Sequence, residues 1–423
     1  MTTRRNLFII AGGAVTVGGA AVLTGCRERG AAVAASAVAA GPEIATAVPD
    51  VVLADSRQGL LVLDSAGSRR LGAEAVAGAD GDLVYAVTPG DSGGSTLVRL
   101  DPARSTPTGR TALARGWLPR VISTDGRSCA LSRTPASALP TARTRTALLV
   151  SNDGTQRRYD LTGVVEPDAF TTDRSGLFVL EWLPATAPDR YRVRLLDLAS
   201  GVMEPLLTRN KVPVPSGAEE EMRGDGRQSV LSPDRQVLYT LYTHQPGHRH
   251  TRDLVSGRPG GVHAFVHVLH LTERWAYCLD LPHPFGEGPA AGHAVAVSAD
   301  GLRLAVVDVT SGSLAYADTA TLTIERVVPV PALEGEAAAL VLSPDGHRVV
   351  VGAGKSVTVV DRHTGGVTAG WFVPGVIHGM GISRDGTRLY AGLAGEIHWV
   401  DANSGALRGR ARVDGLTALR HVR

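Results

Sequence analysis

A two-part unit recurs along the chain from about residue 50 to the C-terminus, and this repeat constrains the fold more than any single motif. Its first part is a Ser/Thr-x-Asp-Gly-type turn that precedes a short apolar run. Copies lie roughly 40 to 66 residues apart, a spacing typical of repeat architectures. The turn occurs at Asp80-Gly81, Ser123–Gly126, Thr172-Asp173, Ser232–Asp234, Ser298–Gly301, Ser343–Gly346 and Ser383–Gly386.

The second part of the unit is a short apolar strand that ends in Asp, and it follows the first part by about 15 to 30 residues. Each period therefore contains four short strands, which we denote a, b, c and d in chain order. Asp recurs in every unit because it suits turns, where it hydrogen-bonds its own backbone. No stretch after residue 48 shows a long 3.6-residue apolar period, so we expect little helix. The strands end at Asp64, Asp101, Asp197, Asp318, Asp361 and Asp401, and two weaker copies lie at Ser151–Gly154 and Leu271–Glu273.

Four-strand units at this period predict an all-β fold, a β-propeller whose stacked blades bury faces that no single blade could bury. The segment Leu342–Gly365, and Ile382–Gly392 together with Val400–Gly405, resemble the YVTN-type and WD-like propeller repeats of exported prokaryotic proteins. The resemblance covers most of residues 50–423. It implies the fold and not the activity, because propellers include both enzymes and scaffolds.

The two parts of the unit occur seven and eight times, and the mismatch predicts how the ring closes. Pro49–Leu53 looks like the second half of another turn running into a strand b, whereas Leu416–Val422 looks like a strand a with nothing after it. We therefore predict a propeller domain over residues 49–423 with eight blades of about 47 residues each. The C-terminal strand a would pair beside the N-terminal strands b, c and d. Seven blades is the alternative, if the copy near Asp80 is not a full blade.

The first residues of the chain differ in composition from the repeat. Arg4 and Arg5 precede residues 7–23, which are all apolar or small apart from one Thr, and the pair resembles a twin-arginine export signal. A charged start followed by a modest apolar run fits a cleaved signal better than a permanent membrane span. We therefore expect a signal peptide over residues 1–25.

A lone cysteine follows that apolar run directly. Leu23–Cys26 resembles a bacterial lipobox, which implies that Cys26 receives lipid and becomes the first residue of the mature protein. The alternative is that an ordinary peptidase cuts later, in the Ala-rich stretch. With lipid on Cys26, residues 26–48 would be a tether, and the protein would be held at the cell membrane on its extracytoplasmic side.

Charge and cysteine content exclude some classes of function. The chain has 43 basic and 41 acidic residues, and without residues 1–25, which hold two Arg and no acid, the balance is 41 to 41. A neutral chain without a basic run is a poor nucleic-acid binder, so we expect no nucleic-acid partner, and we expect a monomer. Cys129 and Cys278 fall a whole blade apart, which argues against a disulfide and for two small buried side chains.

Long insertions are predicted on only one face of the ring. The a–b and c–d turns share one face of a propeller, and the b–c and d–a loops share the other. Insertions gathered on one face often mark a binding face, with neutral drift of surface loops as the alternative. The long loops all belong to the second face, over blades 3 to 5, and they are residues 133–144, 183–190, 208–227 and 243–262.

Two of these loops are rich in histidine and glutamate. Six of the 13 histidines fall within residues 244–270. Imidazole and carboxylate together can hold zinc or another divalent transition metal, although such residues also pack between blades or remain solvated. The histidines at 263 and 267 would share one side of predicted strand c. The candidate metal ligands are His248, His250, His263, His267 and Glu220.

Two functions are compatible with these features of the sequence. The first is a lipid-anchored binding scaffold that presents the blade 3–5 face to a protein, a peptide or a cell-wall glycan, with no cofactor required. It is favoured because no spacing of Ser, His and Asp singles out a catalytic triad and the sequence contains no HExxH motif. The alternative is a metal-dependent propeller hydrolase or lyase, lactonase-like or cyclase-like, with a divalent metal held by the His/Glu residues on the same face.

Overall fold

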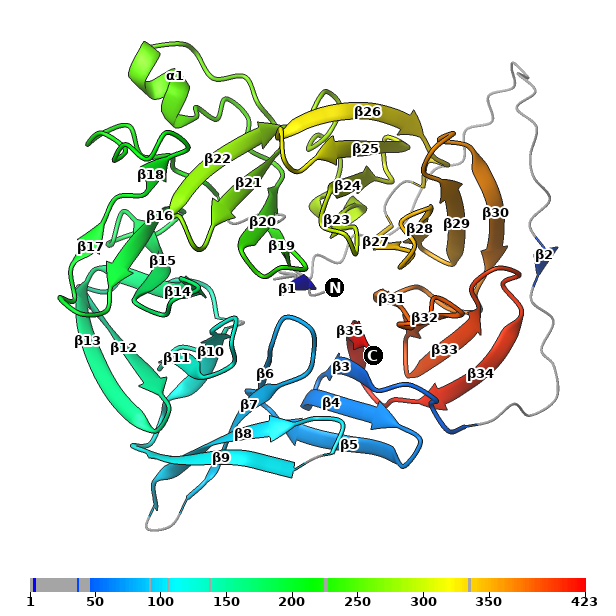
Figure 1. Cartoon of the computed structure of the whole chain (residues 1–423), viewed down its shortest axis with the longest axis horizontal. Helices are drawn as coiled ribbons and strands as arrows, with labels where there is room; N and C mark the ends of the chain where they lie inside the picture. The colour runs from blue at the N-terminus through cyan, green and yellow to red at the C-terminus, as the bar shows by residue number, and fades with distance from the viewer. Residues whose placement is uncertain are drawn as a thin grey trace, which may run out of the picture.

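The described residues form a ring of eight sheets, each built on four antiparallel strands around a central axis (Figure 1). This confirms the predicted all-β propeller and its eight blades. The described residues include the short helices α1 (Thr251–Ser256) and η2 (Ala290–Gly292), and no helix in the described part of the chain is long and apolar enough to cross a membrane. The computed structural model describes residues 3–4, 36–37, 46–90, 93–104, 106–136, 138–223, 227–333 and 336–423.

Each blade runs from axis to rim in the order a, b, c, d (Figure 1). Blade 1 consists of β35 (Leu416–Val422), β3 (Val52–Ser56), β4 (Gly59–Asp64) and β5 (Gly67–Gly72), and blade 2 of β6 (Val76–Ala77), β7 (Val84–Pro89), β8 (Ser95–Asp101) and β9 (Thr106–Leu113). Blade 3 consists of β10 (Leu118–Ile122), β11 (Ser128–Ser132), β12 (Arg145–Asn152) and β13 (Thr155–Thr162), and blade 4 of β14 (Val164–Phe170), β15 (Gly176–Leu183), β16 (Arg190–Asp197) and β17 (Met203–Glu204).

The second half of the ring continues in the same order. Blade 5 consists of β19 (Gln228–Leu231), β20 (Val237–Tyr242), β21 (Phe265–His270) and β22 (Trp275–Asp280), and blade 6 of β23 (His293–Val297), β24 (Arg303–Asp308), β25 (Ser313–Asp318) and β26 (Thr323–Pro329). Blade 7 consists of β27 (Ala338–Leu342), β28 (Arg348–Ala353), β29 (Ser356–Asp361) and β30 (Val367–Phe372), and blade 8 of β31 (Met380–Ile382), β32 (Arg388–Leu393), β33 (Glu396–Asp401) and β34 (Leu407–Arg412). Three two-residue strands add to blade edges: β1 (Thr3–Arg4) to β19, β2 (Ser36–Ala37) to β30, and β18 (Leu207–Thr208) to β22.

The C-terminal strand closes the ring as predicted. β35 pairs antiparallel with β3, with Val52 opposite Val422 and Ser56 opposite Leu416. Blade 1 is thus made from both ends of the propeller domain. The closing strand is held by non-covalent contacts, which include its backbone pairing and a hydrogen bond of 2.6 Å from Arg420 Nε to Asp55 of β3, so the ring needs the tail in place to bury the inner edge of blade 1.

A polar cluster ties the start of the domain to blade 8. The Asp50 carboxylate accepts hydrogen bonds from Arg388 Nε at 2.7 Å, from Arg388 Nη2 at 3.1 Å and from the Tyr390 hydroxyl at 2.6 Å. Beside it, the backbone groups of Val51 and Arg423 exchange hydrogen bonds of 3.0 and 2.9 Å. The first and last residues of the ring therefore meet where other blades have a covalent a–b turn.

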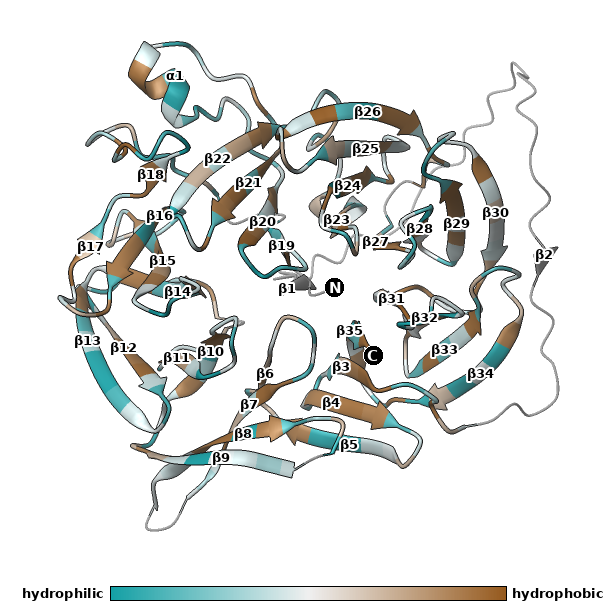
Figure 2. Cartoon of the chain, viewed as in Figure 1, coloured by the Kyte–Doolittle hydropathy of each residue, from teal (hydrophilic) through white to brown (hydrophobic). Residues whose placement is uncertain are grey.

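The apolar core lies between blades and not within one central mass. A middle strand packs against a blade on each side, so β24 and β29 are buried along nearly their whole length. The d strands at the rim have one face in solvent, and β13 and β34 accordingly alternate between buried and exposed residues. Figure 2 shows this gradient as apolar inner and middle strands and more polar outer ones.

The recurring Ser/Thr-x-Asp-Gly turn is a local hydrogen-bonded device. In blade 8, Ser383 Oγ donates to Asp385 Oδ1 at 2.5 Å, and this Asp385 oxygen also accepts the backbone N–H of Thr387 at 3.0 Å. Gly386 completes the turn with a φ of 73°, a left-handed conformation that glycine adopts without strain. The repeated Asp residues are therefore turn residues, as their recurrence indicated.

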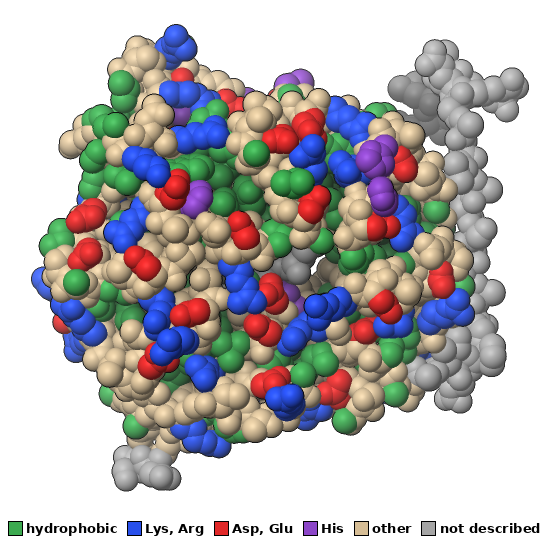
Figure 3. All heavy atoms as spheres, viewed as in Figure 1, with side chains coloured by type: hydrophobic (Ala, Val, Ile, Leu, Met, Phe, Trp, Pro, Cys, Tyr) green, Lys and Arg blue, Asp and Glu red, His purple; other side chains and the backbone are tan. Residues whose placement is uncertain are grey.

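One arginine spans the axis on the face that carries these turns. Arg235 of blade 5 donates to the backbone oxygen of Thr124 in blade 3 at 2.8 Å and pairs with Asp80 of blade 2. Asp82 lies 3.6 Å from the same guanidinium. Acidic and basic side chains are interspersed over the face turned to the viewer in Figure 3, without a large patch of one sign.

Candidate functional site

The long insertions over blades 3 to 5 contact one another and form a continuous layer, which we call the insertion layer. The backbone N–H of Arg143, in the blade 3 loop, donates to Ala185 O in the blade 4 loop at 3.2 Å. Arg190, at the end of that loop, pairs with Glu221 in residues 208–227 at 2.5 Å. Each insertion touches the next, but the start of residues 208–227 lies beside the c–d turns of the other face, where Lys211 pairs with Glu273 at 3.0 Å and Arg209 donates to Ala320 O at 3.0 Å.

The run of three glutamates in residues 208–227 is divided between two blades. Glu219 accepts from Arg192 Nη1 at 2.9 Å and Arg194 Nη1 at 3.2 Å, both on β16 of blade 4, and Glu221 points to the same blade. Glu220 points the opposite way, to blade 5, as expected when successive side chains alternate along an extended chain. The segment thus bridges the two blades.

Glu220 lies at the centre of a buried polar cluster. Its Oε2 is 3.1 Å from His250 Nδ1 and 3.4 Å from His248 Nε2, and it accepts a hydrogen bond from Cys278 Sγ at 3.0 Å. Its Oε1 accepts the backbone N–H of Thr251 at 2.8 Å. Burial opposes ionisation of Glu220, but the hydrogen bonds from the two histidines outweigh it and hold the pKa of the carboxyl well below its usual range.

His250 joins this carboxylate to a second one. Its Nε2 lies 2.6 Å from Asp280 Oδ1, and Arg252 Nη2 holds the other oxygen of Asp280 at 2.5 Å. The backbone of His250 caps helix α1 by donating to Asp253 at 3.1 Å, which fixes where the ring sits. Burial alone would lower the pKa of His250, but the carboxylates of Asp280 and Glu220 raise it to about 9.

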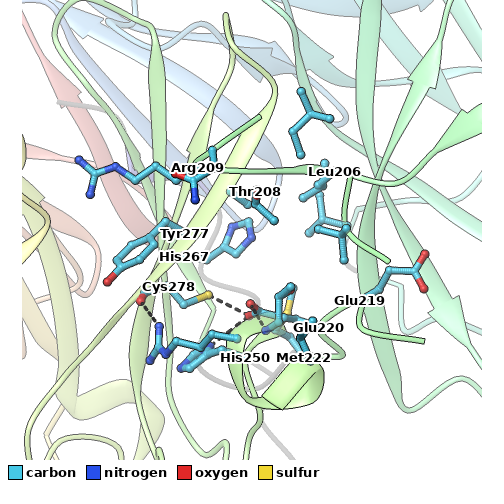
Figure 4. Close-up of a pocket in the computed structure, with 18 residues that line it drawn as sticks. Leu206, Thr208, Arg209, Glu219, Glu220, Met222, His250, His267, Tyr277 and Cys278 are labelled. Carbon is cyan, nitrogen blue, oxygen red and sulfur yellow. Dashed lines mark hydrogen bonds and ion pairs between the residues drawn. The ribbon is translucent and has the colours of Figure 1, made fainter. Parts of the chain in front are cut away.

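A cavity of about 450 Å³ adjoins the cluster, between blades 4 and 5 (Figure 4). Glu220, His250 and Cys278 form part of its wall, so the polar cluster is reached from the cavity. Its other walls are largely apolar and include Val193, Leu206, Met222, Val255 and Tyr277. Such a combination of an apolar body and a few convergent polar groups is typical of ligand sites.

His267 of β21 contributes a second polar group to the same cavity (Figure 4). Its side chain is buried, and its ring meets Tyr242 edge-on at 6.3 Å between centroids. No hydrogen bond joins its ring nitrogens to any residue that the structure describes. Burial lowers the pKa of His267 to about 4, so the imidazole is neutral and can both donate and accept a hydrogen bond.

Three of the five candidate ligands come together. The ligand atoms of Glu220, His248 and His250 all lie within 4.8 Å of one another. His267 lies on the cavity wall. His263 is exposed at a bend before β21, because strand c begins at residue 265, and so it does not share a strand face with His267 as was expected from the sequence.

Two members of the cluster were not identified from the sequence as site residues. Asp280 and Cys278 lie two residues apart on β22, which places both on one face of the strand, and this i, i+2 spacing was the signal that could have found them. The prediction that Cys129 and Cys278 are buried and not bonded to each other is confirmed. The expected lipidation site, Cys26, and Arg5 lie outside the described residues.

Comparison with known proteins finds only distant structural likenesses. No protein-family model and no curated protein matches the chain. Similar solved structures include the dihydro-heme d1 dehydrogenase NirN in complex with DHE, with a TM-score of 0.47 and 15% identity over 90% of this chain and 77% of that one. The periplasmic gluconolactonase PpgL of Pseudomonas aeruginosa has a TM-score of 0.41 and 18% identity over 81% of this chain and 98% of that one. A eukaryotic initiation factor has a TM-score of 0.46 and 13% identity over 88% and 97%. At these values, function has to be argued from the site itself.

Proposed function

We propose that the protein is a lipid-anchored, extracytoplasmic β-propeller that acts as a monomeric binding scaffold. The observation that carries this proposal is the insertion layer, whose four loops are joined to each other and two of which, residues 208–227 and 243–262, line a cavity between blades 4 and 5. Ordering long loops costs conformational entropy, so specific contacts that hold them in place favour a functional role. Its partner would be a protein, a peptide or a cell-wall glycan, and not a nucleic acid.

The insertion layer also exposes large apolar side chains, which supports docking of a partner. Leu139 and Val255 come from two different insertions and are 52% and 64% exposed. Large apolar side chains exposed on a polar surface are one mark of a docking site. Leu302, which is 54% exposed on an a–b turn, provides a matched control on the other face.

A comparison of variants tests the scaffold. The double change Leu139→Asp and Val255→Asp should abolish recovery of a partner that the wild-type protein captures from solubilised cell envelopes. Leu302→Asp should leave recovery unchanged. Equal recovery by the double variant would contradict the proposal, as would a wild-type protein that captures no partner from envelope protein or cell-wall fractions.

The proposed anchor is tested separately. It is supported by the resemblance of Leu23–Cys26 to a lipobox, and Cys26→Ser should move the protein from the membrane fraction to the soluble fraction. Cys129→Ser changes a buried thiol of blade 3 and should not alter fractionation. Changing both Arg4 and Arg5 to Lys should block export. A Cys26→Ser protein that remains membrane-bound would refute the anchor without affecting the scaffold.

A second candidate function is a metal-dependent hydrolase or lyase, lactonase-like or cyclase-like. The grouping of Glu220, His248 and His250 beside a cavity favours it. Purified protein should then turn over a lactone or a cyclisable substrate, lose the activity in a chelator and regain it with a divalent metal. Absence of turnover after metal loading across such a substrate panel would count against this candidate.

A further inference from the structure

We propose that Glu220, His248 and His250 form a zinc-type site whose fourth coordination position is open to the cavity between blades 4 and 5. The inference rests on the same residues as the metal-dependent candidate function, but metal binding can be measured without turnover. It specifies the metal class, the three protein ligands, the residue that orients one of them and the side from which a fourth ligand would come.

Two of the three distances between the ligand atoms match those of a zinc site. Zinc–ligand bonds of about 2.0 to 2.1 Å in a tetrahedral arrangement place donor atoms about 3.4 Å apart. Glu220 Oε2 lies 3.4 Å from His248 Nε2 and 3.1 Å from His250 Nδ1, and all three atoms lie within 4.8 Å of one another. Small side-chain adjustments would therefore suffice to coordinate an ion.

Glu220 and His248 are held in place by groups that do not compete for the ion. The backbone N–H of Thr251 occupies Glu220 Oε1, which directs Oε2 alone at the histidines. The His248 ring stacks on Phe265 with centroids 4.5 Å apart and planes 23° apart. A one-oxygen carboxylate ligand and a packed imidazole are features of a preorganised site.

His250 has the orienting partner that metal-bound histidines usually have. Asp280 Oδ1 lies 2.6 Å from its Nε2, which leaves Nδ1 for the metal, and Arg252 holds the other oxygen of Asp280. A carboxylate on the remote nitrogen of a ligating imidazole fixes the ring and raises its basicity.

The cavity offers the open position. Glu220 and His250 line it, and only three protein ligands converge among the described residues, which is the pattern of catalytic and not structural zinc. Cys278 Sγ lies 3.0 Å from Glu220 Oε2 but outside the group of mutually close ligand atoms. His267, with its ring nitrogens unbonded within the described structure, can hydrogen-bond a water or a small molecule bound there through an oxygen.

Zinc ion alone is the probe for the test. His347 Nδ1 and His363 Nε2 lie 3.0 Å apart on the surface and could bind zinc adventitiously, so all measurements use a His347→Ala background. Isothermal titration and thermal melting of the full-length protein should show one zinc ion per chain and a raised Tm, and Ca²⁺ or Mg²⁺ should not substitute, because both prefer all-oxygen sites.

Variants then assign the ligands. Glu220→Gln and His248→Ala should each weaken zinc binding by about 100-fold or more, and Asp280→Asn by about 10- to 100-fold, the range for orienting residues. His263→Ala removes an exposed histidine of the same segment and should leave the affinity unchanged. Far-UV circular dichroism checks folding; if His248→Ala does not fold, the shape-conserving Glu220→Gln still decides the matter.

Three outcomes would overturn the proposal. The first is no zinc binding by wild-type protein, the second is equal loss in the His263→Ala control, and the third is loss of zinc in Cys278→Ala, which would make the thiol a ligand and close the fourth position. Cobalt substitution should give the visible spectrum of a tetrahedral site without a sulfur charge-transfer band. Zinc binding without turnover would support the zinc site and refute the enzyme function. Turnover by a protein that binds no zinc would refute the zinc site and leave the enzyme function standing.

Discussion

The closing strand makes a quantitative prediction about Leu419, which lies in β35 at the inner edge of blade 1. If the tail closes the ring, truncating this side chain should cost as much as truncating an apolar residue in an inner strand from the middle of the chain. Leu340 of β27 is the matching residue, since it lies on strand a of blade 7 and is similarly buried.

The expected magnitude follows from the packing of Leu419. The residue is 6% exposed, and its backbone N–H donates to His378 O at 3.0 Å. Blade 8 approaches it so closely that a Cβ on Gly379 would lie 2.8 Å from Leu419 O. Leu→Ala removes three carbon groups, roughly 2.4 kcal/mol of transfer free energy at about 0.8 per group, and the residual cavity adds to this. We expect a loss of about 3 kcal/mol.

Urea unfolding of Leu419→Ala, Leu340→Ala and Leu302→Ala measures the effect. The first two should lose similar amounts of unfolding free energy, and the exposed Leu302 should cost less than about 0.5 kcal/mol. A Leu419→Ala protein as stable as Leu302→Ala would show that the tail does not close the ring. A large loss for Leu340→Ala alone would lead to the same conclusion.

Other predictions test single contacts. Asp50→Asn should cost roughly 2 kcal/mol in urea unfolding, because Arg388 and the Tyr390 hydroxyl lose the buried carboxylate that they share and Arg388 keeps only the more exposed Asp385; an unchanged midpoint would contradict this. Tyr316→Phe should stabilise by about 1 kcal/mol, because the Tyr316 hydroxyl is buried without a hydrogen-bond partner among the described residues. Burial raises the pKa of Tyr316 to about 12, so the neutral phenol contributes fully to the free energy of unfolding below about pH 10, and this contribution is lost as the pH rises towards 12. Between about pH 9 and about pH 11 the free energy of unfolding should therefore fall less for the Phe variant than for the wild-type protein. Equal falls in the two proteins would refute this. Gly409→Ala should lower the Tm by several degrees, because its Cβ would lie 2.0 Å from Trp399 Cζ2, and an unchanged Tm would argue against this packing.

The architecture was predictable because its signals are local. Each turn is a hydrogen-bonded unit of a few residues, as between Ser383 and Asp385, so its sequence specifies its geometry without help from distant parts of the chain. Counting the turns, with the half-turn at Pro49–Leu53, therefore gave both the number of blades and the closing strand.

The candidate site was only partly predictable because long loops depend on distant contacts. Glu220 meets His250 across 30 residues, and no local pattern indicates that it turns to blade 5 while Glu219 turns to blade 4. His263 was misplaced because the beginning of a strand after a long loop has no sharp sequence signal. Asp280 lies on a different element again, so its contact with His250 required the assembled blade.

The meeting of Val51 and Arg423 also sets an orientation. They stand in place of an a–b turn, so both ends of the domain emerge on the turn-bearing side of the disc, whereas the b–c loops of the insertion layer occupy the opposite side. If Cys26 carries lipid as proposed, we expect the disc to lie with its turns towards the bilayer. The loops of blades 3 to 5 then face outward, where large molecules of the envelope can approach unobstructed.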